Sequence, residues 1–158
     1  MTMRIGFGYD VHAFARDRPL VLGGVTIPFE YGLSGHSDAD ALIHAVVDAL
    51  LGAASLGDIG THFPSNDLRW QNQLSAVFLD HTYDLLCQLH WKIANIDTTI
   101  VAERPKLTPY VQDMRIHLAE HLHLEIGQVS VKATTTDGLG FAGRREGIAC
   151  YAVALLEK

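Results

Sequence analysis

Residues 35–44 constrain the fold of this chain most, because polar residues there lead directly into an apolar helical pattern. Ser37 and Asp40 match a capping box, in which a hydroxyl and a carboxylate satisfy the free backbone N–H groups of a helix's first turn. Apolar residues then recur every three or four positions, at Ala41, Leu42, Val46, Ala49, Leu50 and Ala53. This spacing predicts an amphipathic helix that starts after His36 and ends near Gly52 or Gly57.

A polar row follows the same predicted helix. Asp40, His44 and Asp48 lie four residues apart and so share one face. A metal-binding imidazole usually has an orienting partner, and His44 would have a carboxylate on either side. A histidine with ordinary hydrogen bonds fits the same spacing, so the pattern leaves both interpretations of His44 open.

Length and charge limit the classes of protein to consider. The chain has 158 residues, enough for one domain over residues 1–158 with a substantial core. Its 18 acidic and 12 basic residues argue against binding to nucleic acid or to an anionic membrane, since both need a broad basic surface. Two widely spaced cysteines and an N-terminus without an apolar leader favour a cytoplasmic protein. The hydrophobic fraction of 48% favours an oligomer with a buried subunit face.

The predicted elements follow the order strand, hairpin, helix, helix, strand, helix, strand, strand. Strands are predicted at residues 3–12, 93–102, 128–134 and 148–156, a hairpin at residues 20–28, and later helices at residues 74–90 and 111–123. This order predicts an α+β fold, with a mixed four-stranded sheet, a separate β-hairpin and helices on one face.

Asp10 and His12 lie at the end of the first predicted strand, two residues apart, so they project from the same face. With His44 they supply one carboxylate and two imidazoles, a common ligand set for catalytic zinc with one open position. Unrelated surface and core histidines remain the alternative, because the sequence does not show that the three residues meet. The remaining histidines outside residues 35–44 have no comparable partners and are expected on the surface: His62, His81, His90, His117, His121 and His123.

Two loops have compositions that suit a ligand. Residues 57–67 are rich in Gly, Pro and Asn and are long enough for a binding loop, although a plain connector fits them equally. The threonines at 134–136, near Lys132 and Arg144, offer hydroxyls and cations to phosphate, and Asp137 could hold a hard cation such as magnesium. Threonine runs are also common in strands, so this loop has two interpretations as well.

Three glycines at 138, 140 and 143 fit the spacing of a dinucleotide-binding fingerprint. That fingerprint must open a helix early in a βαβ unit, whereas these glycines precede the final predicted strand. We therefore reject a dinucleotide-binding fold.

A series of motifs spans nearly the whole chain in one register. Its members are Phe7-Gly8-Tyr9-Asp10-Val11-His12, Gly23-Gly24-Val25, His36-Ser37-Asp38, Asp48-Ala49-Leu50-Leu51-Gly52-Ala53, Gly57-Asp58-Ile59-Gly60, Pro105-Lys106, Lys132-Ala133-Thr134-Thr135-Thr136 and Gly147-Ile148-Ala149-Cys150. Together they resemble the 2-C-methyl-D-erythritol 2,4-cyclodiphosphate synthase family, and the fixed order makes the resemblance far more specific than any single motif.

The resemblance implies a lyase of the non-mevalonate isoprenoid pathway that converts 4-diphosphocytidyl-2-C-methyl-D-erythritol 2-phosphate to the cyclic diphosphate and CMP. It also implies a homotrimer, with the sheets facing a threefold axis and active sites between neighbouring subunits. The substrate's own 2-phosphate attacks the β-phosphorus, so the protein needs no nucleophile of its own. A metal-dependent phosphohydrolase and a non-catalytic trimeric nucleotide-binding module are the alternatives.

The resemblance also implies roles for individual residues. Asp10, His12 and His44 would bind zinc, His36 and Thr135 would stabilise the transition state, and Asp137 would hold Mg²⁺ or Mn²⁺. The implied substrate-binding residues are Asp10, His12, His36, Ser37, Asp58, Ile59, Gly60, Phe63, Pro64, Ser65, Asn66 and Asp67, then Ala102, Pro105, Lys106, Leu107 and Thr108 for the cytosine, and Thr134, Thr135, Thr136, Asp137, Phe141 and Arg144 for the diphosphocytidyl end.

The chain departs from the family pattern at four places. Asp137 stands where the family usually has Glu, and Ser65 replaces a frequent Asp. The segments Thr61-His62 and Leu74-Ser75-Ala76 also differ. These departures affect the expected sugar and second-cation contacts and leave the expected zinc ligands intact.

Overall fold

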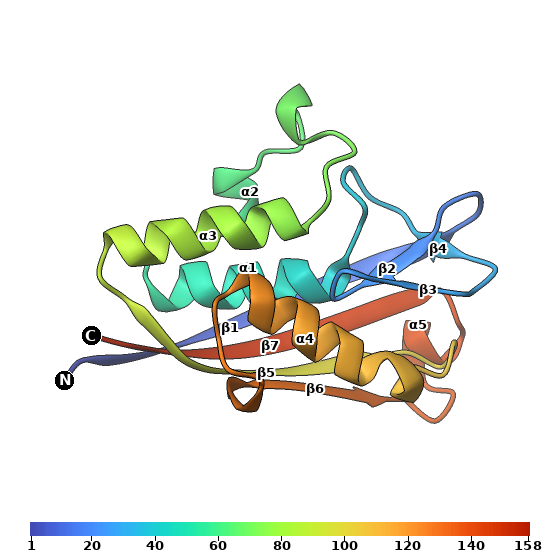
Figure 1. The fold of residues 1–158 in the computed structure, drawn as a ribbon. Helices are drawn as coiled ribbons and strands as arrows, with labels where there is room; N and C mark the ends of the chain where they lie inside the picture. The colour runs from blue at the N-terminus through green and yellow to red at the C-terminus, as the bar shows by residue number, and fades with distance from the viewer.

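A five-stranded mixed sheet, in the order β4-β1-β7-β5-β6, forms one layer of the protein in a computed structural model that describes all 158 residues (Figure 1). The strands are β1 (Met3–Ala15), β4 (Gly32–Leu33), β5 (Lys92–Val101), β6 (Val129–Thr134) and β7 (Gly147–Glu157). Only β5 and β6 pair in parallel. The predicted mixed sheet is confirmed, but the predicted count of four strands is wrong, because a two-residue edge strand such as β4 is too short to show a period.

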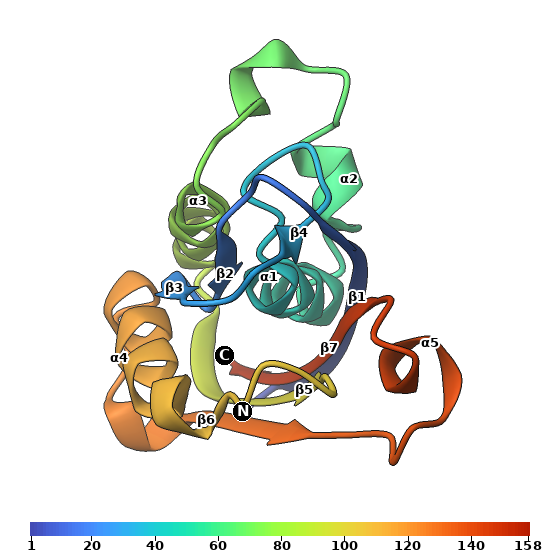
Figure 2. The same ribbon diagram turned by 90° about the vertical axis from the view of Figure 1, so that its right-hand side faces the viewer.

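The hairpin and the helices complete the fold. Strands β2 (Leu20–Leu22) and β3 (Val25–Ile27) form the predicted hairpin as a separate two-stranded sheet. The helices are α1 (Ala41–Ala53), α2 (Ile59–His62), α3 (Ala76–Gln88), α4 (Val111–His121) and α5 (Gly140–Gly143), with 3-10 turns at Leu68–Trp70, Thr108–Tyr110 and Ile126–Gln128. Figure 2 shows α1, α3 and α4 on the same side of the sheet, as predicted.

Helix α1 lies between the sheet and α3 and is buried on nearly every side. The predicted helix therefore forms, but eleven of its thirteen residues are buried, His44 of the polar row among them, so it lacks the exposed face that an amphipathic helix usually has. The sheet lies very close: a Cβ on Gly8 of β1 would stand 1.8 Å from the Ala45 carbonyl oxygen, and one on Gly6 would stand 1.9 Å from that of Ala49. These two glycines therefore allow α1 to lie directly against β1.

The N-terminus of α1 is capped by Asp40 and not by Ser37, so the predicted capping box is wrong. Asp40 Oδ1 accepts the Ile43 N–H at 3.0 Å and the Gly23 N–H at 2.9 Å, while Oδ2 accepts the Gly24 N–H at 2.7 Å. Ala39 has a left-handed backbone (φ 58°), which keeps the preceding residues out of the helical path. Asp40 therefore joins the hairpin turn to the helix, and burial raises the pKa of its carboxyl to about 6.

The sheet face opposite the helices is apolar and open. Ile5 is 73% exposed and Phe7 is 63% exposed, although both belong to the longest strand. Tyr9 and Tyr151 lie beside them with ring centroids 5.1 Å apart, and Val11 and Val153 extend the same surface. An apolar area of this extent is characteristic of a surface that binds another protein chain.

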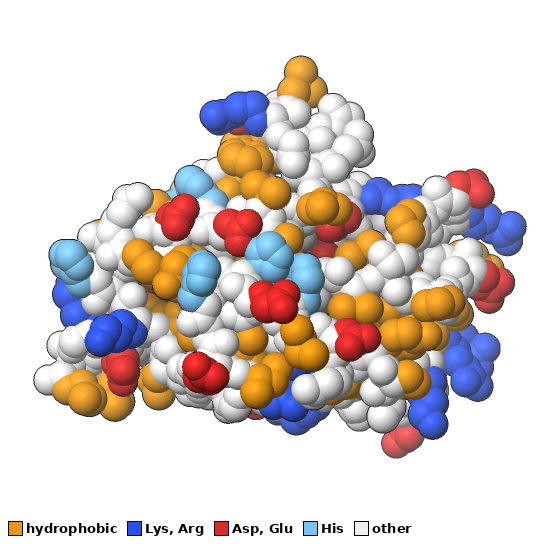
Figure 3. Space-filling view, viewed as in Figure 1, with side chains coloured by type: hydrophobic (Ala, Val, Ile, Leu, Met, Phe, Trp, Pro, Cys, Tyr) orange, Lys and Arg blue, Asp and Glu red, His pale blue; other side chains and the backbone are white.

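The opposite surface, over α3 and α4, carries acidic and histidine side chains (Figure 3), among them Asp80, Glu120, His121 and His123. The prediction that six histidines lie on the surface holds for half of them: His81, His90 and His123 are exposed, while His62, His117 and His121 are half-buried. None of the helices has the length and apolar character needed to cross a membrane.

Candidate metal centre and substrate site

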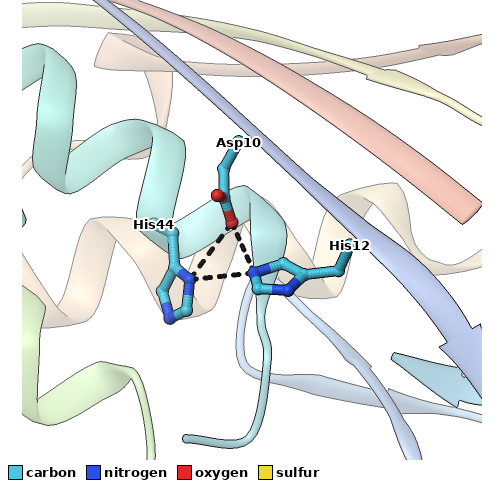
Figure 4. Close-up of side chains that lie close together, drawn as sticks. All are labelled: Asp10, His12 and His44. Carbon is cyan, nitrogen blue, oxygen red and sulfur yellow. Dashed lines mark hydrogen bonds and ion pairs between the residues drawn. The ribbon is translucent and has the colours of Figure 1, made fainter. Parts of the chain in front are cut away.

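Asp10 and His12 on β1 meet His44 on α1, as the sequence suggested (Figure 4). Asp10 Oδ2 lies 2.7 Å from His12 Nε2 and 3.1 Å from His44 Nδ1, and the two ring nitrogens are 3.3 Å apart. One carboxylate oxygen and two imidazole nitrogens thus converge on one point. This donor set fits a divalent metal ion.

The ionisation of Asp10 and His12 reflects the same closeness. Burial would raise the pKa of Asp10, but hydrogen bonds and charge from His12 and His44 outweigh it and lower this pKa to about 2. Burial would likewise lower the pKa of His12, but its contact with the Asp10 carboxylate raises it above the ordinary value. The carboxylate therefore attracts positive charge into the triad, as a cation site requires.

The orienting partners of His44 are serines, so the prediction that Asp40 and Asp48 orient it is wrong. His44 Nε2 lies 2.8 Å from Ser75 Oγ and 3.2 Å from Ser37 Oγ. Asp48 Oδ1 instead accepts a hydrogen bond from the Ile59 N–H at 2.7 Å, and Asp40 Oδ1 accepts one from the Gly23 N–H of the hairpin turn. Each carboxylate binds free backbone N–H groups of a loop that packs beside α1, and helical spacing cannot reveal such loops.

A cavity of about 300 Å³ adjoins the triad. Its lining includes His12 and His44 together with the predicted residues His36, Ser37, Ile59, Gly60, Phe63 and Ser65, and also Trp70 and Phe78. Phe63 stacks on Phe78 with ring centroids 4.5 Å apart and contacts the edge of Trp70 at 5.1 Å. The cavity thus has a polar, metal-facing side and an aromatic side. Trp70 and Phe78 were not predicted, because an aromatic residue in a loop or in an apolar helical row is usually structural.

Other residues of the predicted loop have local partners. Asp58 caps α2 by accepting the Thr61 N–H at 2.8 Å, and Asp67 accepts the Arg69 N–H at 3.0 Å. Pro64 is half-buried and Asn66 is exposed, and neither lines the cavity.

A second cavity of about 230 Å³ lies beyond the ends of the parallel strands β5 and β6. Residues 102–108 and 133–135 line it, which brings together the predicted Ala102, Pro105, Lys106, Leu107, Thr108, Thr134 and Thr135. Glu103 joins the two loops, because its Oε1 accepts N–H groups from Gly138 at 2.9 Å and from Thr136 at 3.2 Å. These hydrogen bonds lower the pKa of Glu103, a residue that the sequence did not single out.

The two cavities share no lining residue, so one chain does not bring all predicted substrate residues together. Asp137 is exposed beside Thr135, whose Oγ1 donates to Asp137 Oδ1 at 3.3 Å, and it is not part of the triad. Phe141 lies on α5, and Arg144 forms an exposed ion pair with Glu146 at 2.8 Å.

Comparison with known proteins gives one result throughout. Residues 3–157 match the model of the YgbB family. The 2-C-methyl-D-erythritol 2,4-cyclodiphosphate synthase of Pelotomaculum thermopropionicum is 58% identical over 156 residues, which cover 99% of this chain and 96% of that one.

Solved structures agree. The CDP-bound form of a 2C-methyl-D-erythritol-2,4-cyclodiphosphate synthase matches with a TM-score of 0.90 and 36% identity, over 98% of this chain and 100% of that chain. The bifunctional IspDF of Campylobacter jejuni matches with a TM-score of 0.94 and 42% identity, over 98% of this chain and 42% of that longer chain. The chain therefore belongs to the YgbB family.

Proposed function

We propose that this chain is a 2-C-methyl-D-erythritol 2,4-cyclodiphosphate synthase, which converts 4-diphosphocytidyl-2-C-methyl-D-erythritol 2-phosphate to the cyclic diphosphate and CMP. The observation that carries the proposal is the convergence of Asp10, His12 and His44 beside a cavity that also contains His36 and Ser37. The full-length identity of 58% to a named synthase supports the same reaction.

Zinc is the metal that we assign to the triad. Two imidazoles and one carboxylate form a usual zinc ligand set and leave one coordination position for substrate. A zinc ion held by these three residues would act as a Lewis acid toward phosphate oxygens and would supply positive charge to them. The protein has a net charge of −6, so local positive charge of this kind is needed to bind a polyanion.

The chain's own residues position the substrate. One oxygen of the 2-phosphate attacks the β-phosphorus, and the bond from that phosphorus to the oxygen shared with the α-phosphate breaks, so that CMP leaves with this oxygen. We assign His36, at the triad cavity, and Thr135, at the second cavity, to the support of the charge that develops on the phosphates. The aromatic side formed by Phe63, Trp70 and Phe78 would exclude water and so favour cyclisation over hydrolysis.

The second cavity is the cytosine site in this proposal. It would take the base through residues 102–108 and the diphosphate through residues 134–136, and the CDP-bound relative supports a cytidine diphosphate-linked substrate. Asp137, with its exposed carboxylate near Thr135, would hold Mg²⁺ or Mn²⁺.

We infer a homotrimer with active sites between subunits. The open apolar sheet face around Ile5 and Phe7 supports assembly around an axis. The lack of shared residues between the two cavities supports a site that combines the triad of one subunit with the 134–144 segment of its neighbour. The unpaired cysteines Cys87 and Cys150 fit the reducing cytoplasm that we propose as its location.

The experiment that tests this function follows the phosphorus resonances of the diphosphocytidyl substrate after addition of the zinc-loaded protein. We expect a cyclic diphosphate and one CMP for each substrate consumed. A linear phosphate product with oxygen from labelled water would indicate a phosphohydrolase instead. Tight CDP binding without turnover would indicate a nucleotide-binding module. Light scattering on the same sample measures the number of subunits.

A further inference from the structure

Asp38, Ser75 and His44 form a hydrogen-bonded row that starts in the loop before α1 and ends at the metal triad. Ser75 Oγ makes a short hydrogen bond to Asp38 Oδ1, and its backbone N–H donates to Asp38 Oδ2 at 2.9 Å. The same Ser75 Oγ lies 2.8 Å from His44 Nε2. Ser75 is fully buried and His44 is 9% exposed, so water does not compete for these contacts.

The direction of each proton in the row follows from Asp38. Three donors point at this carboxylate: the Ser75 hydroxyl, the Ser75 N–H and the Asp40 N–H, the last at 3.1 Å. A carboxylate surrounded in this way accepts hydrogen bonds, so the single hydroxyl proton of Ser75 is directed at Asp38. Ser75 Oγ can then face His44 Nε2 only as an acceptor.

If Ser75 Oγ accepts this hydrogen bond, His44 Nε2 must carry the proton that it donates. In the neutral ring the other nitrogen, Nδ1, then has no proton and presents its lone pair to Asp10 and His12, as a metal ligand must. Without this constraint, Asp10 Oδ2 at 3.1 Å would favour a proton on Nδ1, which excludes the metal. Ser37 is a weaker alternative partner, since it lies 3.2 Å from Nε2 and also accepts the Ala39 N–H.

We propose that Asp38 and Ser75 are positioning residues that hold His44 in the Nε2–H tautomer and thereby set the affinity of the triad for its metal. The proposal rests on the metal centre in the proposed function. Backbone hydrogen bonds tie the same region to the wall of the cavity. The Asn72 N–H donates to the His36 carbonyl oxygen at 3.1 Å, and the Asp38 N–H donates to the Gln73 carbonyl oxygen at 3.2 Å. The segment that carries Trp70 thus ends in a residue that contacts a metal ligand.

The first test measures zinc affinity by competition with a chromogenic chelator. We expect Ser75→Ala and Asp38→Asn to bind zinc roughly 10–100-fold more weakly, the usual effect of losing such a partner. Ser75→Thr retains the hydroxyl and should restore most of the affinity. Thr82→Ala is the matched control, because it removes a fully buried hydroxyl within α3, one that donates to the Phe78 carbonyl oxygen at 2.7 Å. Circular dichroism checks that each variant is folded.

The second test reads the tautomer directly. Long-range ¹H–¹⁵N spectra of the metal-free protein at alkaline pH distinguish a proton on Nε2 from one on Nδ1, and the His44 signals are assigned by their absence in His44→Gln. We expect Nε2–H in the wild type and a shift toward Nδ1–H in Asp38→Asn. Wild-type zinc affinity in Ser75→Ala, or the same His44 tautomer in all variants, would overturn the proposal.

Neither test uses the substrate, so the two proposals can fail separately. A protein that binds zinc with the expected variant effects but forms no cyclic diphosphate would contradict the proposed reaction and support the positioning role. A protein that forms the cyclic diphosphate while Ser75→Ala keeps full zinc affinity would do the reverse.

Discussion

His12 Nδ1 lies 2.7 Å from the Ser34 carbonyl oxygen, so this nitrogen must carry the proton that it donates. In the neutral ring, Nε2 is then the nitrogen with the free lone pair, and it faces Asp10 in the orientation that a metal ligand needs. Backbone on one side and Asp10 on the other thus fix the ring of His12 before any metal binds.

The loss of His44 should remove the metal without unfolding the chain. His44→Ala leaves only Asp10 and His12 as ligands, and two ligands bind zinc poorly. We expect a decrease in metal affinity of at least about 100-fold, loss of activity, and an unchanged circular dichroism spectrum. Elemental analysis of the purified variant measures this, and full zinc occupancy would contradict the ligand assignment.

Metal binding should weaken as the pH falls, starting above the ordinary histidine value of 6.5. The pKa of His12 is raised in the metal-free protein, so its protonated form, which cannot bind metal, persists to higher pH than usual. Zinc titrations at a series of pH values measure this effect. An Asp10→Asn variant serves as the comparison, since removal of the carboxylate should lower the pKa of His12.

The same groups predict how the stability of the metal-free protein varies with pH. The pKa of His12 is higher in the folded chain than its ordinary value of 6.5. Its contribution to the free energy of unfolding is therefore complete below pH 6.5 and is lost as the pH rises through the raised pKa. The pKa of Asp10 is about 2 in the folded chain and 3.8 in its ordinary state. Its contribution to the free energy of unfolding, at most about 2 kcal/mol, is therefore lost as the pH falls from 3.8 to about 2. Urea unfolding of apoprotein across this pH range should therefore show highest stability at mildly acidic pH, and Asp10→Asn should flatten the curve.

Asp40 should be the most costly carboxylate to remove. In Asp40→Ala the helix loses its N-cap and the N–H groups of Gly23 and Gly24 lose their partner. We expect a loss of about 3 kcal/mol in the free energy of unfolding, from about 1 kcal/mol for a cap and 1 kcal/mol or more for each buried unpaired donor. Urea denaturation tests this, with Ser37→Ala expected to cost less because its hydroxyl accepts only the Ala39 N–H from the backbone.

Glu103 should affect the nucleotide and not the metal. Glu103→Ala frees the N–H groups of Thr136 and Gly138 and should loosen the loop of the second cavity. We expect CDP to bind roughly five- to tenfold more weakly, with unchanged zinc content, and Glu103→Gln to have a smaller effect because it keeps an acceptor oxygen. Calorimetric titration with CDP measures the affinities, and the exposed Glu120→Gln on α4 is the control. A parallel loss of zinc would argue against two separate parts of the site.

Mixtures of two inactive variants test the shared active site. If the triad of one subunit works with Thr135 of the next, His44→Ala and Thr135→Ala should complement each other when refolded together. Random assembly from equal amounts leaves about one quarter of the interfaces with both residues intact, so about one quarter of the wild-type rate is expected. Mixtures that remain inactive would place the whole site within one chain.

The sequence predicted those features that depend on short-range periodicity. The strands, the hairpin around Gly23 and Gly24 and the long helices lie within a few residues of their predicted positions, since each has a clear period. Strand β4 has only two residues, and the cap at Asp40 depends on the left-handed backbone of Ala39, so neither could be predicted from local patterns.

The triad was predicted only as a set of suitable residues. Its convergence depends on Gly6 and Gly8, which let α1 lie against β1, and this packing is not visible in the spacing of Asp10, His12 and His44. Ser75 was missed as a site residue because it lies at the start of the helix predicted over residues 74–90, where a serine indicates only a helix start. Its role depends on contact with residues 37 positions earlier, which only the folded chain provides.

The close approach of α1 to β1 has a consequence for the energetics of metal capture. The carbonyl oxygens of Ala45 and Ala49 lie directly over Gly8 and Gly6, so the strand that carries two ligands and the helix that carries the third cannot slide past one another. Assembling the donor atoms therefore costs conformational entropy when the chain folds and very little when the ion arrives. Capture of the ion should accordingly be limited by loss of its hydration shell and by release of ligand protons.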